Sequence, residues 1–140
     1  MEMLLFEVNQ SIGIIENIIL RKNELTEINW QSQLVVENLR AAVTNGRIKN
    51  STLRKLILVT YFRAIEFNQM MQHINSPEYT SAILTGDAQT RYNVIEFTKK
   101  TKTQLIQGAE GTGDISYLSQ FKYLKQKLEE YITNLTAEIV

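Results

Sequence analysis

The chain has 140 residues, of which 44% are hydrophobic and 21% are charged, a composition typical of a globular protein. Its 15 basic and 15 acidic residues cancel, and it has no cysteine, which excludes disulfides and thiolate metal sites. No uncharged apolar run approaches the roughly 18 residues of a membrane span, and residues 1–7 lack a basic leader or a cleavage site. We therefore expect a cytoplasmic protein that does not bind membranes.

Apolar residues recur every three or four positions along the chain, which predicts an all-α fold. We expect a compact bundle of five or six helices that forms a single domain over residues 1–140. The predicted helices cover, in chain order, about 3–21, 27–44, 51–74, 77–85, 88–107 and 115–135. Their ends are marked by residues typical of caps and turns: Asn45-Gly46, Asn50 or Ser51, Ser76, Asp87, the loop 108–113 and Asp114.

The same pattern predicts which side chains form the core. The third predicted helix is apolar almost all round in its middle, so we expect it at the centre of the bundle. Trp30 is expected near the start of the second helix, with Leu34 and Val35 facing inward. The 11 Phe and Tyr residues fall mostly on apolar helix faces, which predicts core positions for most of them.

Positive charge is concentrated in two segments of this neutral chain. Residues 47–55 carry a net charge of +4 and residues 91–104 a net charge of +3, whereas the segments around them are acidic. We call Arg47, Lys49, Arg54 and Lys55 the basic cluster. Because a helix N-terminus adds free N–H groups and a partial positive charge, this segment predicts a local anion site. An ordinary solvated first turn is the alternative interpretation.

Residues that could carry catalysis are scarce. His73 is the one histidine; we expect it at the surface near a helix end, where it has no nucleophile or metal ligand to pair with. Glu129 and Glu130 are adjacent and face different directions, and the glycines of 108–113 lack the strand and the Lys-Ser/Thr of a phosphate loop. The sequence therefore predicts a protein that is not an enzyme, with no metal, cofactor or small-molecule substrate.

Three segments over about residues 50–132 follow a recognisable order. The first, Ser51–Ile57, reads STLRKLI, and it resembles the Thr-Ser-x-Ile-Arg-Lys helix start of the Csm small-subunit family, with Leu in place of Ile. The others match further helices of that family in spacing: Arg91, Val94 and Phe97, then Phe121, Leu128 and Tyr131. The chain departs from the family at 87–90, where a Tyr-x-Ala-Gly usually precedes the arginine.

The family is the small subunit of type III-A CRISPR effector complexes. The resemblance implies a non-catalytic helical protein, present in several copies, that contacts the guide–target RNA backbone beside other effector subunits. By position it implies that Arg54 and Lys55 contact RNA and that Arg91 lies near it; we add Arg47 and Lys49 because they are close in sequence. Basic side chains bind phosphate without reading bases, as a subunit that accepts any guide requires.

A helical adaptor or chaperone that binds partner helices and no nucleic acid is the alternative function. Its apolar docking surface is expected at residues 4–6 or at Met70-Met71. A helical accessory protein that binds nucleic acid on its own is a third possibility, although zero net charge counts against it.

Overall fold

The computed structural model describes residues 1–111 and 116–139 of the chain. These residues form six α-helices and one short 3-10 helix, Leu25–Glu27, with no strand among them, which confirms the all-α prediction. The α-helices are α1 (Glu2–Leu20), α2 (Glu37–Thr44), α3 (Ser51–Ile74), α4 (Pro77–Thr85), α5 (Ala88–Glu110) and α6 (Tyr117–Ile139).

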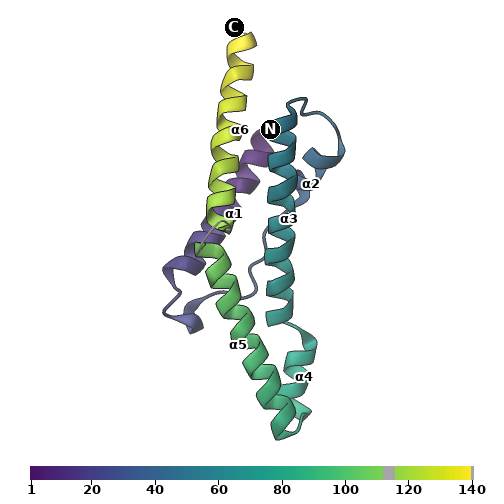
Figure 1. Cartoon of the computed structure of the whole chain (residues 1–140), viewed down its shortest axis with the longest axis vertical. Helices are drawn as coiled ribbons and strands as arrows, with labels where there is room; N and C mark the ends of the chain where they lie inside the picture. Colours follow the sequence, from purple (N-terminus) through teal and green to yellow (C-terminus); the bar gives the residue numbers. More distant parts are fainter. Residues whose placement is uncertain (112–115, 140) are drawn as a thin grey trace.

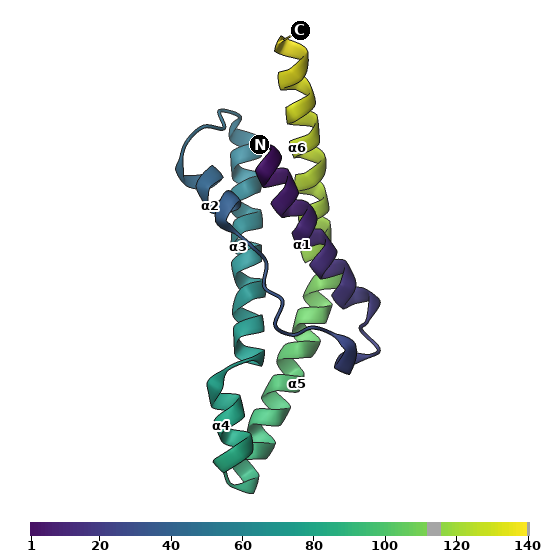
Figure 2. The ribbon, with the colours of Figure 1, turned by 180° about the vertical axis from the view of Figure 1, so that it is seen from behind.

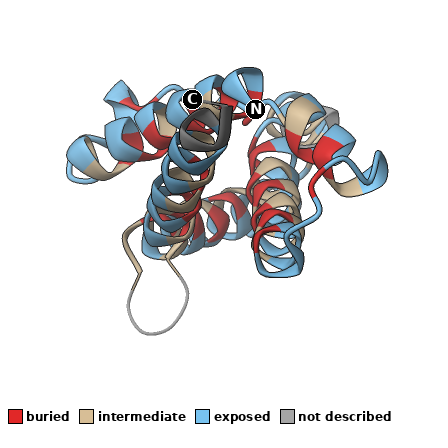
Figure 3. Ribbon diagram, turned by 90° about the horizontal axis from the view of Figure 1, so that it is seen from above, coloured by how far each residue is buried: buried red, intermediate tan, exposed pale blue. Residues whose placement is uncertain are grey.

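The helices form an elongated bundle. In Figure 1, α3 descends along one side, α4 turns the chain at the far end, and α5 and α6 return along the other side. Seen from behind, α1, α2 and the segment 28–36 lie across these long helices (Figure 2). α1 packs along α6 and also contacts α2 and α5, whereas α3 packs against α2, α5 and α6. Buried residues line the inward faces of both layers (Figure 3).

α1 supplies one side of the core. Its residues Leu4, Val8, Ile12 and Ile15 are buried in the apolar cluster that joins α1, α2, α3, α5 and α6. α1 is also the one helix in the described part of the chain that is long and apolar enough to cross a membrane by length and composition. Its buried residues are Leu4, Glu7, Val8, Ser11, Ile12, Ile15 and Ile18, which form one stripe along the helix.

The second predicted helix is wrong over residues 27–36, because Glu27 ends the short 3-10 helix and residues 28–36 contain no helix. Asn68 of α3 holds this segment: its Nδ2 donates to the Leu34 carbonyl at 2.8 Å, and its Oδ1 accepts from the Leu34 N–H at 2.7 Å. These bonds satisfy both backbone groups of Leu34 without a helix. Leu34 is buried as predicted, but Val35 is 50% exposed.

The first turn of α2 is capped by a side chain of α1. The carboxylate of Glu7 is 2% exposed, and its two oxygens accept from the backbone N–H groups of Asn38 and Leu39, each at 2.9 Å. Val36, at the cap position itself, has no side-chain acceptor. A carboxylate at a helix N-terminus is favourable, so this buried charge joins α1 to α2.

Two of the predicted caps are confirmed. The Asn50 side chain accepts from the Leu53 N–H at 3.0 Å, so Asn50, and not Ser51, caps α3. The Asp87 carboxylate accepts from the Thr90 N–H at 2.7 Å, and this bond lowers the pKa of Asp87.

The connection between α5 and α6 differs from its prediction. α5 continues past 107 to Glu110. The ring of Tyr117 packs against α5 at Gly108, where a Cβ would stand 2.6 Å from that ring. α5 ends at Gly111, where φ is +78°. Asp114 lies outside the described residues, and the Ser116 hydroxyl accepts from the Ser119 N–H at 3.1 Å. Burial beside Glu66 raises the pKa of Tyr117 to about 12.

α3 does not lie at the centre of the bundle. One face, which includes Ile57, Ala64 and Phe67, is fully buried, but Val59 is 44% exposed and Phe62 is 54% exposed. The expected core location is also wrong for other aromatic residues. Those more than half exposed are Phe6, Phe62, Tyr92, Phe97 and Tyr123. The apolar character of α3 therefore supplies one buried face and one exposed face.

Candidate nucleic-acid interface

The loop between α2 and α3 turns two basic side chains outward. Gly46 has a φ of +67°, and the Asn45 side chain accepts from the Arg47 N–H at 3.0 Å, which shapes the turn. Ile48 is buried in the core, while Arg47 and Lys49 on either side of it are exposed. In extended backbone, successive side chains point to opposite sides, so burial of Ile48 directs both cations to solvent.

The first turn of α3 supplies the other two cations of the basic cluster. Asn50 caps the helix and Leu53 is buried, which leaves Arg54 and Lys55 exposed and about 100° apart around the axis. The first turn of α3 contains no acidic residue. None of the four cations forms an ion pair with a described residue. Their charge and the positive end of the helix are therefore not neutralised within the described part of the fold.

Helix α6 brings aromatic side chains to the same end of α3. A groove of about 320 Å³ lies between the two helices, with Asn50 and Thr52 on one side and Tyr123 and Tyr131 on the other. Lys127, also in this groove, lies 5.6 Å from the centroid of the Tyr123 ring. Sequence reasoning missed these α6 residues, because no local pattern connects them with a helix start some 70 positions earlier.

Lys127 differs from the basic cluster in having an acidic partner. Its Nζ lies 3.3 Å from the carboxylate of Glu130, which lines the same groove. The groove is therefore close to neutral, and the free positive charge lies beside it, in the basic cluster.

The structure does not bring Arg91 to the basic cluster. The cluster lies at the start of α3, whose 24 residues span about 36 Å, and α5 begins beyond the other end (Figure 1). Arg91 is exposed and has no ion pair with a described residue. A polyanion that contacts both must therefore extend along most of α3.

Two cations of the second basic segment, Lys99 and Lys102, contact other side chains. Lys99 lies 3.6 Å from the Glu96 carboxylate, and Lys102 lies 5.1 Å from the centroid of the Trp30 ring. Trp30 does not lie in a helix: it is half-buried in the segment before α2, where its indole N–H donates to the Leu25 carbonyl at 3.0 Å. Of the two basic segments, residues 47–55 are the stronger candidate for binding an anion.

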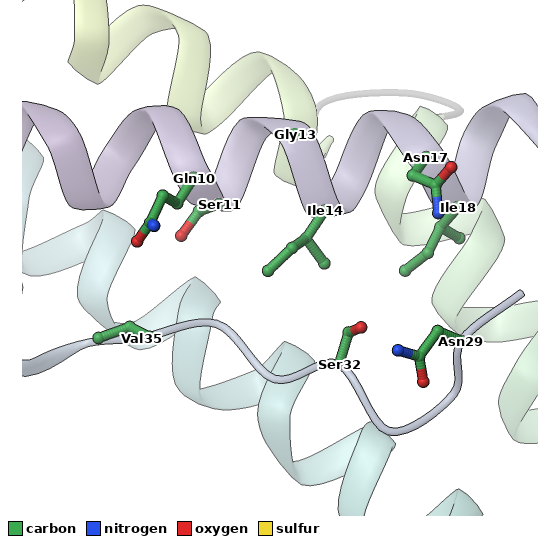
Figure 4. A pocket seen from close by; sticks show the side chains of 9 residues that line it. All are labelled: Gln10, Ser11, Gly13, Ile14, Asn17, Ile18, Asn29, Ser32 and Val35. Atoms are coloured by element: carbon green, nitrogen blue, oxygen red, sulfur yellow. The ribbon is translucent and has the colours of Figure 1, made fainter.

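A groove of about 480 Å³ on the opposite face has different chemistry. It lies between α1 and the segment 28–36, where Gln10, Asn17 and Asn29 supply neutral amides around Ile14 (Figure 4). No charged residue lines it. Gly13 of α1 is exposed here, with nothing within 4 Å of a Cβ position. Lacking cations, this groove is poorly suited to phosphate.

The remaining candidates from the sequence are isolated. His73 is exposed in the last turn of α3, as predicted, and its ring lies 6.2 Å from that of Phe97. Among the side chains that the structure describes, no group of three or more His, Asp or Glu residues could hold a metal ion. Met71 is buried and Met70 half-buried, so this pair does not form the exposed apolar surface considered for an adaptor; at 4–6 only Phe6 is exposed.

No known protein family, curated protein or solved structure matches this chain.

Proposed function

We propose that this chain is a non-catalytic, RNA-contacting subunit of a type III CRISPR effector ribonucleoprotein. In this role several copies bind the backbone of guide and target RNA in the cytoplasm, beside other effector subunits. The observation that supports the proposal is the basic cluster: four exposed cations without described acidic partners surround a helix N-terminus.

The basic cluster suits phosphate and not bases. Arg47 and Arg54 can each direct two N–H donors at one phosphate, whereas Lys49 and Lys55 act as point charges. The Leu53 N–H of the first turn is taken by the Asn50 side chain, and the N–H groups of Ser51 and Thr52 supply further donors for a phosphate. None of these contacts depends on sequence, so the cluster would bind any guide with similar affinity.

A single copy should bind weakly. Zero net charge and the acidic segments around the cluster limit long-range attraction. Each neutralised phosphate of single-stranded RNA contributes about −0.7 to the log–log salt slope, so three or four contacts give modest affinity at physiological salt. Neighbouring copies on one RNA would raise the effective concentration of each binding site.

The test compares two double variants, each of which removes an arginine and the lysine that follows it in the sequence. Arg54→Ala with Lys55→Ala should weaken RNA binding for all sequences alike and reduce the salt slope by about 1.4, or two phosphate contacts. The matched control, Arg21→Ala with Lys22→Ala, removes the same residue types from a pair that contacts Glu27 and Glu110, and should change binding little. Circular dichroism of each variant checks the fold. Equal affinity and equal slope for wild type and the 54/55 variant would contradict RNA binding by the cluster.

RNAs of different length test whether the two basic segments contact the same RNA molecule. Because Arg91 lies beyond the far end of α3, Arg91→Ala should weaken binding only of RNAs that extend about 36 Å or more from the basic cluster. Equal losses for short and long RNAs would mean that Arg91 binds separately. If neither segment affects RNA binding, the adaptor function becomes the better interpretation, since Phe6, Val59 and Phe62 offer exposed apolar surface.

A further inference from the structure

One face of α3 is apolar and is not covered by another described element. Val59 and Phe62 are exposed on it, and the half-buried Leu58 and Ile65 lie beside them. No helix crosses in front of α3 in Figure 1, because α1, α2 and the segment 28–36 all lie behind it. Val59 and Phe62 lie one turn apart on this face, which is the spacing through which a second helix could pack against α3.

The charges at the two ends of this face have opposite signs. Lys55 precedes Val59 by one helical turn, and Glu66 follows Phe62 by one turn. The spacing of four, three and four residues places all four side chains on one stripe, which we call the α3 stripe. The side chains of Lys55 and Glu66 are both exposed.

The α3 stripe is complementary to itself when reversed. Residues 55 and 66 are equally distant from the midpoint between Thr60 and Tyr61, and so are residues 59 and 62. If two copies of α3 pack antiparallel about a two-fold axis through this midpoint, Lys55 meets Glu66 of the other copy at both ends. Val59 then meets Phe62 of the other copy in between. A parallel pair in register would instead place lysine against lysine and glutamate against glutamate.

We propose that two copies of this chain associate through antiparallel packing of their α3 stripes. The charge complementarity of the stripe selects a second copy as the partner. Arg63 lies at the edge, where it bonds Glu66 at 3.0 Å, and the Tyr117 hydroxyl lies 3.5 Å from the same carboxylate. The side chain of Glu66 is still 47% exposed, so it can accept Lys55 of the other copy as well.

The proposed dimer is small and does not depend on the RNA function. A few turns of one helix bury less than the about 800 Å² per partner of a standard interface, so we expect a dissociation constant in the micromolar range or weaker. Lys55 belongs to both the basic cluster and the α3 stripe, whereas Arg47, Lys49 and Arg54 lie outside the stripe and stay exposed in the pair. Dimer formation, measured without RNA and tested by Phe62 as well as by the end charges, can therefore fail while RNA binding through these three residues persists, and the reverse.

Charge reversal tests both the surface and the orientation. Sedimentation equilibrium of the full chain without RNA measures the dimer. Lys55→Glu alone creates two acidic contacts and Glu66→Lys alone creates two basic contacts, so each should weaken the homodimer on the order of tenfold. An equal mixture of the two variants should restore association as a heterodimer, because an antiparallel pair then joins opposite charges at both ends.

Phe62→Ser should also weaken the dimer, whereas Phe6→Ser, which alters a similarly exposed phenylalanine of α1, should not. Circular dichroism confirms that each variant is folded. The proposal is overturned if the wild-type chain stays monomeric at hundreds of micromolar. It is equally overturned if the dimer is insensitive to Phe62→Ser, or if mixing the two charge variants restores nothing.

Discussion

The N-termini of α2 and α3 contrast in how the positive end of a helix is neutralised. At α2, the buried carboxylate of Glu7 accepts from two backbone N–H groups, and Glu37 adds a second acidic group in the first turn. At α3, the neutral amide of Asn50 accepts from one N–H, no acidic residue is present in the first turn, and the basic cluster adds positive charge. The α2 end is therefore neutralised by side chains of the fold, whereas the α3 end keeps its positive charge facing solvent. We therefore expect the α2 end to contribute more to stability, and the proposed RNA contacts to lie at the α3 end.

The largest expected effect lies at the α2 end. Glu7→Ala should lower the free energy of unfolding by about 3 kcal/mol, because it leaves the buried N–H of Leu39 and the partly buried N–H of Asn38 without acceptors and opens a cavity. Glu7→Gln retains an oxygen acceptor but no charge, so its loss should be smaller. Chemical denaturation measures both.

Glu16→Ala is the matched control for Glu7→Ala. Glu16 is an exposed residue of the same helix, 3.5 Å from Lys122, and its loss should cost less than about 1 kcal/mol. If Glu7→Ala and Glu16→Ala cost the same, Glu7 is not the group that holds α2 in place.

The cap of α3 should matter less. Asn50→Ala should lower the free energy of unfolding by about 1 kcal/mol, the usual value for an N-cap side chain. Asn50→Asp keeps the acceptor and adds a favourable charge, so it should be at least as stable as wild type. Thermal and urea unfolding check the order, and an Asn50→Asp variant less stable than Asn50→Ala would contradict this account of the α3 end.

The smallest effect on stability is expected for an acidic substitution in the first turn of α3, which should change stability and RNA binding in opposite directions. Ser51→Glu places at α3 the kind of acidic first-turn residue that α2 already has, and should stabilise the free protein by about 0.5 kcal/mol at low salt. The same change should weaken RNA binding, because it neutralises part of the basic cluster.

Ser119→Glu, in the first turn of α6, provides the control for Ser51→Glu. It adds the same charge near another helix start and should leave RNA affinity nearly unchanged. Unfolding and RNA-binding titrations of both variants, repeated at about 1 M salt, should show the electrostatic differences shrinking with screening. If the Ser51→Glu variant binds RNA as well as wild type, the N-terminus of α3 is not part of an RNA-binding site.

Several features of the fold could be predicted from the sequence because they depend on nearby residues. The bounds of α3 and α4, and the start of α5, follow from periodicity and from caps such as Asn50 and Asp87. The start of the second helix could not be predicted, since Asn68, over 30 positions away, bonds the backbone of Leu34, whereas its end at Thr44 agrees with the prediction. The exposed aromatic residues were also unpredictable, because periodicity shows that a helix has an apolar face and not whether another helix covers it.

The sequence by itself determined that this chain is helical and that Arg54 and Lys55 lie at the start of a helix, because both follow from hydrogen bonds and side-chain spacing within a few residues. Only the tertiary structure decided that Glu7 caps α2, that Tyr123 lies beside the basic cluster and that Arg91 lies a helix length away. It also decided that Val59 and Phe62 face outward. These outcomes depend on which faces of distant helices bury each other, and that is set by packing among residues far apart in the chain.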